Sequence, residues 1–172
     1  MTSVMNIQSP LVFTIGHSTH PIDQFIALLK QHGVEALADV RTYPGSGRNP
    51  QFNQEPLKRS LNDSGITYYH MVSLGGRRKR PKPADPEKFS HAGPFAAYID
   101  YTKTESFQTG LSALEDLASK TTTAIMCAEA LWRNCHRQFI AQAMEIHGFA
   151  VTHITDKANR QDIDRSPTIP GL

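Results

Sequence analysis

Two cysteines lie close together in the stretch AIMCAEALWRNCHR, which spans residues 124–137. A cysteine becomes a strong nucleophile when its surroundings stabilise the thiolate. Cys135 comes directly before a predicted helix with Asn134 as its N-cap, and free N–H groups at a helix N-terminus lower a thiol pKa. Cys127 ends a predicted strand, where a nucleophile is commonly displayed. Glu129 and His136 lie next to the cysteines in sequence and can transfer a proton. The candidate catalytic residues are therefore Cys127, Cys135, Glu129 and His136.

Other uses of the same residues stay open. Zinc prefers sulfur and imidazole ligands, and the strand ends offer a set of them: Cys127, Cys135, His136 and either His17 or His70. The two cysteines are further apart in sequence than the close pairs of ordinary zinc modules, so we predict no metal and keep zinc as the alternative. A third interpretation treats both cysteines as small apolar residues that only pack.

Four segments each follow a predicted strand, and basic residues gather in three of them. The segments read GHST, DVRTYPGSGRNP, LGGRRKRPKP and CAEALWRNCHR. Nine of the 18 Lys and Arg residues lie in them: Arg41, Arg48, Arg77, Arg78, Lys79, Arg80, Lys82, Arg133 and Arg137. The run GGRRKRPK suits phosphate groups, with a solvated loop as the alternative. We therefore predict an anionic substrate, and a nucleotide or nucleic acid is the class that we expect.

Several further residues complete the predicted binding site. His17 and Ser18 follow a glycine at a strand end, and the backbone N–H groups of such a passage can hold an anion. Asp39 can orient Arg41 or hold backbone N–H groups of the first loop, and a simple salt bridge with Arg41 is the alternative. Trp132 offers an aromatic face on which a base can stack. The candidate substrate-binding residues are therefore His17, Ser18, Asp39, Arg41, Arg48, Arg77, Arg78, Arg80, Trp132 and Arg137.

The elements that must position these residues alternate between strands and helices. Apolar runs bounded by turn residues predict five strands: Leu11–Ile15, Val34–Val40, Ile66–Val72, Thr121–Cys127 and Phe149–Thr155. Helical spacing of apolar residues predicts helices over 22–33, Gln54–Asp63, Pro94–Ser119 with a break near Thr104, and His136–His147. This order predicts an α/β fold: a single domain with a mainly parallel five-stranded sheet, helices on both faces and Rossmann-like or rhodanese-like layering. Ligands bind at the carboxyl ends of such strands, so the candidate residues should meet at one edge of the sheet.

The length of 172 residues suits one domain with a buried core. We expect a disordered lead over residues 1–10, the α/β domain over 11–155 and a polar tail over 156–172. A net charge of +2 is too small to identify a partner. No apolar run approaches the roughly 18 residues of a membrane span, and no signal peptide is recognisable, so we expect a cytoplasmic protein without a membrane partner. There, two cysteines are expected as thiols rather than as a structural disulfide.

Several motifs occur in an order that resembles a known family. They are TIGHST near the start, ADVRTYPGSGRNPQFN, GITYYH followed by LGGRR, and MCAE with CHR before a helix. Over residues 12–155 the chain resembles the bacterial and archaeal domain-of-unknown-function family 488. The resemblance implies a small α/β domain and brings no established activity with it.

A weaker likeness in layout concerns rhodanese-type sulfurtransferases and related thiol phosphatases. They also place DVR after an early strand and a reactive cysteine at a strand end, as residues 39–41 and Cys127 do here. Those enzymes close a short loop between cysteine and arginine, so that backbone N–H groups surround the sulfur. Here the segment from Cys127 to Arg137 is longer and lacks glycine, so the likeness extends to layout alone.

These observations lead to one main hypothesis about function. We expect a thiol-dependent enzyme, a transferase or hydrolase, that acts on an anionic small molecule or nucleic acid at the carboxyl edge of the sheet. One alternative is a nucleic-acid-binding accessory domain without chemistry of its own. The other is a rhodanese-like transfer of sulfur.

Overall fold

The computed structural model describes residues 9–77 and 93–155. Five strands form one sheet: β1 (Leu11–Gly16), β2 (Ala36–Asp39), β3 (Thr67–His70), β4 (Thr123–Cys127) and β5 (Ala150–His153). Neighbouring strands are parallel throughout, in the order β3-β2-β4-β1-β5. The predicted five-stranded parallel sheet is confirmed, although β2, β3, β4 and β5 are shorter than predicted. Three predictions fall outside the described residues: most of the lead (1–8), the basic run with Arg78 and Arg80, and the tail (156–172).

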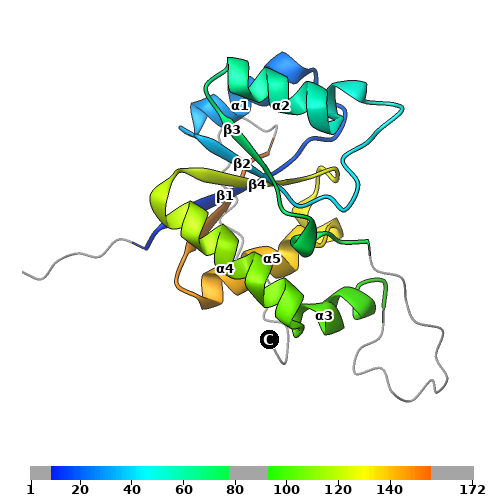
Figure 1. Ribbon diagram of the computed structural model, residues 1–172, viewed down its shortest axis with the longest axis vertical. Coiled ribbons are helices and arrows are strands. Elements are labelled where there is room, and N and C mark those ends of the chain that lie inside the picture. The colour runs from blue at the N-terminus through cyan, green and yellow to red at the C-terminus, as the bar shows by residue number, and fades with distance from the viewer. Residues whose placement is uncertain (1–8, 78–92, 156–172) are drawn as a thin grey trace, which may run out of the picture.

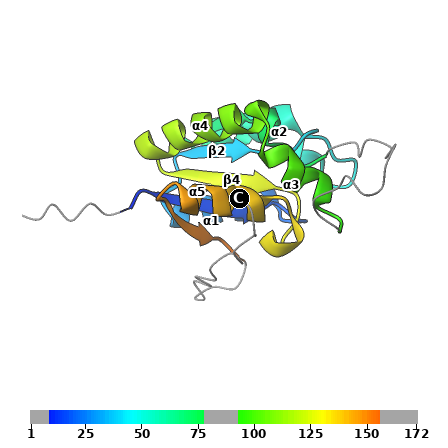
Figure 2. The same ribbon diagram turned by 90° about the horizontal axis from the view of Figure 1, so that it is seen from below.

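Helices cover both faces of the sheet, as predicted (Figure 1, Figure 2). One face carries α1 (Ile22–Gln31) and α2 (Gln54–Asp63), and the other carries α3 (Ala96–Thr102), α4 (Glu105–Lys120) and α5 (Arg137–Ile146). Short 3₁₀ helices lie in the connections, over Pro50–Phe52, Val72–Leu74 and Trp132–Asn134. Among the described residues, no helix is long and apolar enough to cross a membrane.

The predicted break near Thr104 is the start of α4. The hydroxyl oxygen of Thr104 accepts a hydrogen bond from the backbone N–H of Phe107 at 3.4 Å. A threonine in this position satisfies one of the N–H groups that the first turn of a helix leaves without a partner. The side chain therefore starts a new helix after α3 instead of continuing the old one.

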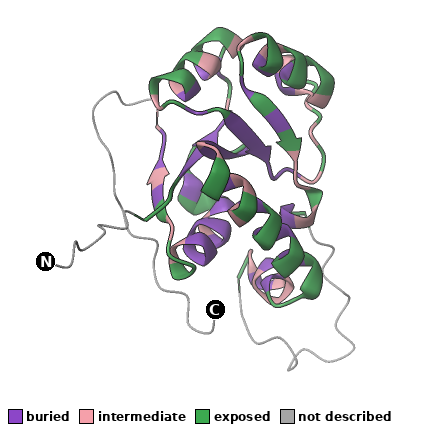
Figure 3. Ribbon diagram, turned by 60° about the vertical axis from the view of Figure 1, so that its left-hand side comes forward, coloured by how far each residue is buried: buried purple, intermediate pink, exposed green. Residues whose placement is uncertain are grey.

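Strand β4 lies in the middle of the sheet and is buried along its whole length (Figure 3). Its alternate residues face two separate cores. Ile125 and Cys127 pack with residues of α4 and α5, whereas Ala124 and Met126 pack with residues of α1 and α2. Because helices cover both faces, the strand reads as a continuous apolar run rather than as an alternating one.

The connections between strands leave the sheet in two directions. Those from β1 to β2 and from β2 to β3 contain α1 and α2, and those that follow β3 and β4 contain α3, α4 and α5 on the opposite face. At the carboxyl end of β4 the chain therefore turns away from the connections that leave its two neighbours, β1 and β2. Such a reversal opens a crevice in parallel sheets. The strand order thus favours a binding site where β1, β2 and β4 end.

Candidate functional site

A pocket of about 770 Å³ opens at the carboxyl ends of β1, β2 and β4. The loops after these strands form most of its wall, and the segment after β3 adds Gly76 and Arg77. Most of the candidate residues line it: His17, Ser18, Arg41, Arg48, Arg77, Cys127, Glu129, Cys135 and His136. The structure therefore brings residues from all four of the segments that follow the first four strands to one place.

Three candidate residues lie behind the pocket wall. Asp39 is buried next to Arg41, and Arg137 is buried behind the loop that joins the two cysteines. Trp132 is only 5% exposed and stacks on His153, with ring centroids 4.0 Å apart and planes 5° from parallel. The expectation that a base stacks on Trp132 is therefore wrong, because both the burial and the partner close off its ring.

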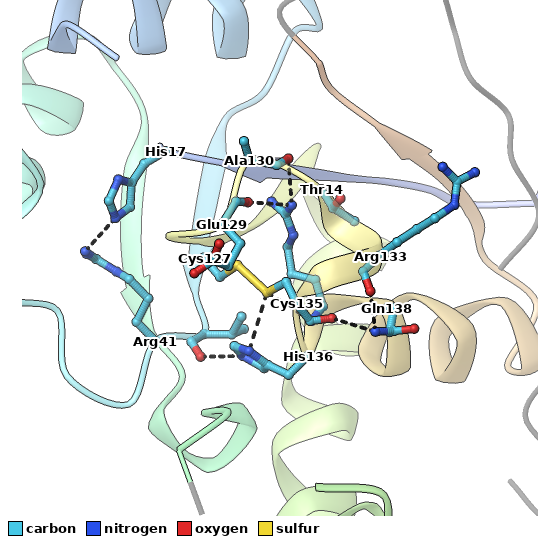
Figure 4. Close-up of a disulfide and its surroundings, with 12 residues drawn as sticks. Thr14, His17, Arg41, Cys127, Glu129, Ala130, Arg133, Cys135, His136 and Gln138 are labelled. Atoms are coloured by element: carbon cyan, nitrogen blue, oxygen red, sulfur yellow. Dashed lines mark hydrogen bonds between the residues drawn. A yellow bond between two sulfur atoms is a disulfide. The ribbon is translucent and has the colours of Figure 1, made fainter. Parts of the chain in front are cut away.

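The sulfur atoms of Cys127 and Cys135 are joined as a disulfide in the pocket wall (Figure 4). The expectation of two separate thiols is corrected by this bond. The chain after β4 turns back through the 3₁₀ helix at Trp132–Asn134, and this turn brings the second sulfur to the first. Both cysteines are nearly buried by the protein, so any reaction at them takes place through the pocket.

Cys135 lies at the N-terminal end of α5, as the sequence predicts. Its Sγ accepts a hydrogen bond from the backbone N–H of Arg137 at 3.4 Å and lies 3.5 Å from Nδ1 of His136. The predicted N-cap is wrong, because Asn134 belongs to the 3₁₀ helix and His136 occupies the N-cap position. The sulfur of Cys135 thus satisfies an N–H group that a capping oxygen would otherwise take.

The ring of His136 has a fixed orientation. Its Nε2 donates a hydrogen bond to the carbonyl oxygen of Val40 at 2.9 Å, so a neutral ring presents Nδ1 to Cys135 as an acceptor. Gly76 packs so closely on the ring that a Cβ at this position would overlap with it. Tyr98 makes a T-shaped contact, with centroids 5.2 Å apart. These contacts hold a potential proton acceptor next to the sulfur.

A buried ion pair of Asp39 and Arg41 supports the pocket wall. The carboxylate of Asp39 accepts hydrogen bonds from the backbone N–H, Nε and Nη2 of Arg41 at 3.0, 2.9 and 2.6 Å. The hydroxyl of Tyr68 donates to the same carboxylate at 2.8 Å, and burial and the charge of Asp39 raise the pKa of Tyr68. Asp39 therefore orients Arg41. The role of Tyr68 carries no sequence signal, since a tyrosine in a strand resembles a core residue.

His17 is a hydrogen-bond acceptor for Arg41. Its Nδ1 donates to the carbonyl oxygen of Ser18 at 2.9 Å, which leaves Nε2 to accept from Nη1 of Arg41 at 3.3 Å. Burial, and then the charge of Arg41, lowers the pKa of His17 to about 4. The ring also stacks on Phe52, with centroids 4.3 Å apart. At neutral pH, His17 is therefore uncharged and fixes Arg41 rather than attracting an anion.

The loop after β4 packs tightly on the end of β1. The backbone N–H groups of His17 and Ser18 donate to the carbonyl oxygens of Cys127 and Ala128 at 2.9 and 3.0 Å. The expected use of these N–H groups for an anion is therefore wrong, because the protein itself occupies them. Gly16 lies so close to the carbonyl oxygen of Glu129 that a Cβ would overlap with it.

Comparison with known proteins assigns the chain to a family. The family model described as Domain of unknown function DUF488 matches residues 21–144. The chain belongs to this family. The resemblance seen in the sequence motifs is therefore confirmed. No curated protein and no solved structure gives a significant match to the chain.

The DUF488 match contains both cysteines and the residues around them, whereas His17 and Ser18 precede it and β5 follows it. Arg137 lies within the match and is 1% exposed. Its Nη2 donates to the carbonyl oxygens of Glu129 and Ala130 at 2.9 and 3.3 Å. In the described part of the chain its Nε and Nη1 have no hydrogen-bond partner, and burial lowers its pKa to about 10. Arg137 thus supports the cysteine loop from behind.

The DUF488 cysteine loop has a second anchor in the stack of Trp132 on His153 of β5. The hydroxyl of Thr14 and Nδ1 of His153 share a hydrogen bond of 2.7 Å. Burial, and then the charges of Arg137 and Arg133, lowers the pKa of His153 to about 4. Neither Thr14 nor His153 could be predicted, because each follows the pattern of its strand and the contact joins distant parts of the sequence.

Glu129 lies on the exposed side of the DUF488 loop, beside Cys127 and at the pocket (Figure 4). A carboxylate there can exchange protons with a bound molecule or with water. Within residues 9–77 and 93–155, no group of three or more His, Cys, Asp or Glu residues is placed to hold a metal ion.

Proposed function

We propose that the protein is a thiol-dependent enzyme in which reduced Cys135 is the nucleophile and the pocket holds a small anionic substrate. The observation that carries the proposal is the environment of the Cys135 sulfur. It receives the N–H of Arg137 at the start of α5 and lies 3.5 Å from Nδ1 of His136. Both contacts favour a thiolate, which is the reactive form of cysteine.

His136 is the proton acceptor in this proposal. When the disulfide is reduced, the thiol of Cys135 gives its proton to Nδ1, and the charged ring keeps the bond from Nε2 to the Val40 carbonyl. The Arg137 N–H stabilises the sulfur anion that results. Cys127 has none of these contacts in the described residues, so the two cysteines differ in reactivity although they share one pocket wall.

The charges in the wall support an anionic substrate. Arg48 and Arg77 line the pocket, and no described carboxylate pairs with either guanidinium group. Arg41 is different, because Asp39 neutralises it. Among the described residues that line the pocket, Glu129 is the one carboxylate. Because no carboxylate in the described part of the chain pairs with Arg48 or Arg77, the pocket favours a ligand with at least one negative group.

The loop that carries Arg48 is well fixed. The backbone N–H of Ser46 donates to Oδ1 of Asn53 at 2.6 Å, and the N–H of Asn49 donates to Oγ of Ser46 at 3.0 Å. Arg77 is placed by its own backbone N–H, which donates to Oγ1 of Thr42 at 3.0 Å. An anion site made of arginines on fixed loops loses little entropy when a ligand binds.

The test is the alkylation rate of each cysteine in the reduced protein, measured with iodoacetamide across pH in the single variants Cys127→Ser and Cys135→Ser. Each variant retains one cysteine, so Cys127→Ser gives the rate of Cys135 and Cys135→Ser gives the rate of Cys127. We expect Cys135 to react at least about tenfold faster than Cys127 at pH 7. His136→Gln retains a donor for the Val40 carbonyl and lacks the proton acceptor, so it should remove this advantage.

Equal and slow rates at both cysteines would rule out the proposal. The rival, a nucleic-acid-binding domain without chemistry, predicts that neither cysteine is activated. It also predicts salt-dependent binding to an oligonucleotide that both cysteine variants leave unchanged.

A further inference from the structure

The loop between the cysteines keeps its shape through contacts other than the disulfide. At its start, the N–H groups of residues 17 and 18 hold the carbonyls of residues 127 and 128. In its middle, Arg137 holds the carbonyls of residues 129 and 130. At its end, Trp132 stacks on His153, and the N–H of Cys135 donates to the carbonyl oxygen of Trp132 at 3.2 Å. The sulfur atoms therefore stay within reach of each other when the bond between them is broken.

Because Cys127 lies within reach of Cys135, it can displace a group bound to the Cys135 sulfur and form the disulfide. This reaction limits which substrates the pair can use. When Cys135 carries a group X, Cys127 forms the disulfide by attack on the Cys135 sulfur, and X must leave with the electrons of the S–X bond. An acyl or phosphoryl group does not leave in this way, because the nucleophile attacks its carbon or phosphorus instead. A thiolate does leave in this way. The pair therefore fits a substrate that itself contains a disulfide.

A small peroxide is another substrate that could oxidise the cysteine pair. The size and charge of the pocket favour a disulfide over a peroxide. A peroxide needs neither a cavity of about 770 Å³ nor the guanidinium groups of Arg48 and Arg77, with which no carboxylate of residues 9–77 and 93–155 pairs. A small disulfide with carboxylate groups uses both features. Tyr43, which is 71% exposed in the wall, and Phe95 add apolar surface for the rest of such a molecule.

We infer that the protein catalyses thiol–disulfide exchange with small disulfides that carry carboxylate groups. The inference rests on the proposed function, because it uses Cys135 as the nucleophile. The Cys135 thiolate attacks one sulfur of the substrate, the substrate disulfide breaks, and the leaving thiolate takes a proton from His136. Cys127 loses its proton to water or to Glu129 and attacks the Cys135 sulfur, which releases the second thiolate.

The electrons balance over these two steps. The substrate disulfide is reduced to two thiols, and the protein dithiol is oxidised to the disulfide of Cys127 and Cys135. A small dithiol, acting through the same exchange in reverse, reduces the protein and completes the cycle. The disulfide in the structure is the oxidised half of this cycle.

The test uses the reduced protein and the carboxylate-bearing aromatic disulfide dithiobis(nitrobenzoate), whose released thiolate is coloured. We expect two coloured thiolates for each chain and a final mass that equals that of the oxidised chain. Cys127→Ser, or Cys127→Ala as a second variant, should release one coloured thiolate and keep the other thionitrobenzoate on Cys135 as a mixed disulfide. With dithiothreitol as the reductant, the rate above that of dithiothreitol alone should rise in proportion to the concentration of wild-type protein.

Substrate charge is tested with the same assay. Arg48→Gln together with Arg77→Gln should slow the reaction with the anionic disulfide about tenfold and leave that with neutral dipyridyl disulfide unchanged. Arg59→Gln is the matched control, because Arg59 is an exposed arginine on α2 that does not line the pocket. Equal slowing of both disulfides would overturn the preference for carboxylates.

Two further outcomes separate this inference from the proposed function. If wild-type Cys135 reacts fast but retains the thionitrobenzoate group, the exchange cycle is overturned and Cys135 remains the nucleophile of the proposed function. If neither cysteine reacts faster than a free dithiol of the same concentration, both are overturned.

Discussion

Asp39 lies wholly inside the protein and accepts four hydrogen bonds, three from Arg41 and one from Tyr68. A buried carboxylate keeps its charge at an acceptable cost when a cation and several donors surround it. Arg41 gains a fixed direction from the same contacts, and His17 adds one more. The side of the pocket that is formed by β2 therefore depends on a single carboxylate that no ligand can touch.

Replacement of Asp39 measures that dependence. Asp39→Asn leaves the guanidinium of Arg41 buried without its counter-charge, so we expect the free energy of unfolding to fall by about 3–5 kcal/mol. Tyr68→Phe removes one hydrogen bond to the same carboxylate and should cost about 1–2 kcal/mol. Urea denaturation of both variants gives the two values. Equal losses would show that removal of the counter-charge costs no more than removal of the single hydrogen bond from Tyr68.

At the scale of elements, the end of β1 and the loop after β4 form one unit. Two backbone hydrogen bonds join them, and the carbonyl oxygen of Glu129 occupies the space beside Gly16. A glycine is required there because of this close approach and not because of its backbone angles. The loop that carries both cysteines is therefore positioned by a strand on which neither cysteine lies.

Enlargement of Gly16 should displace that loop. In Gly16→Ala the new methyl group overlaps with the Glu129 carbonyl, so we expect a loss of about 2–3 kcal/mol in unfolding free energy. Slower alkylation of reduced Cys135 should accompany it. Gly47→Ala is the control, because a Cβ at that loop glycine meets nothing within 4 Å. An unchanged Cys135 rate in Gly16→Ala would mean that the loop does not need this contact.

At the scale of the whole molecule, two buried histidines make stability depend on pH. His17 and His153 have a pKa of about 4 in the folded protein, against the ordinary value of 6.5. Between these values the unfolded chain binds more protons than the folded one. The free energy of unfolding is therefore at its full value above pH 6.5 and falls as the pH is lowered towards 4.

We expect each histidine to account for a loss on the order of 3 kcal/mol across that window. Urea denaturation at pH 7 and pH 4.5 measures the change. His17→Gln and His153→Gln should each make the change smaller, whatever they cost at pH 7. His147→Gln removes an exposed histidine at the end of α5 and serves as the control. Equal unfolding free energies at the two pH values would contradict this assignment.

Much of the fold could be predicted from the sequence, because local signals determine it. Continuous apolar runs indicate buried strands, and turn residues separate them from helices, as the glycine at 33 and the cap at Thr104 illustrate. The parallel arrangement follows from the alternation of strands and helices. Since the carboxyl ends of parallel strands share one edge, the grouping of the basic segments could be predicted as well.

The parts that could not be predicted depend on contacts between distant residues. The bond between Cys127 and Cys135 requires the turn at residues 132–134, and cysteines of a cytoplasmic protein are expected as thiols. The burial of Trp132 depends on His153, and the burial of Arg137 depends on the carbonyls of a preceding loop. In each case the residue type is compatible with a surface role, and only the packing decides otherwise.

Trp132 is the one tryptophan in the 172 residues, and it lies between the two cysteines with its ring stacked on His153. Its fluorescence therefore comes entirely from the loop that holds the sulfur atoms. An emission spectrum that is excited where tryptophan absorbs and the five tyrosines do not follows that loop alone during reduction, substrate addition or a pH titration, without a label or a mutation. The molecule thus contains its own optical probe, located beside the atoms whose chemistry is in question.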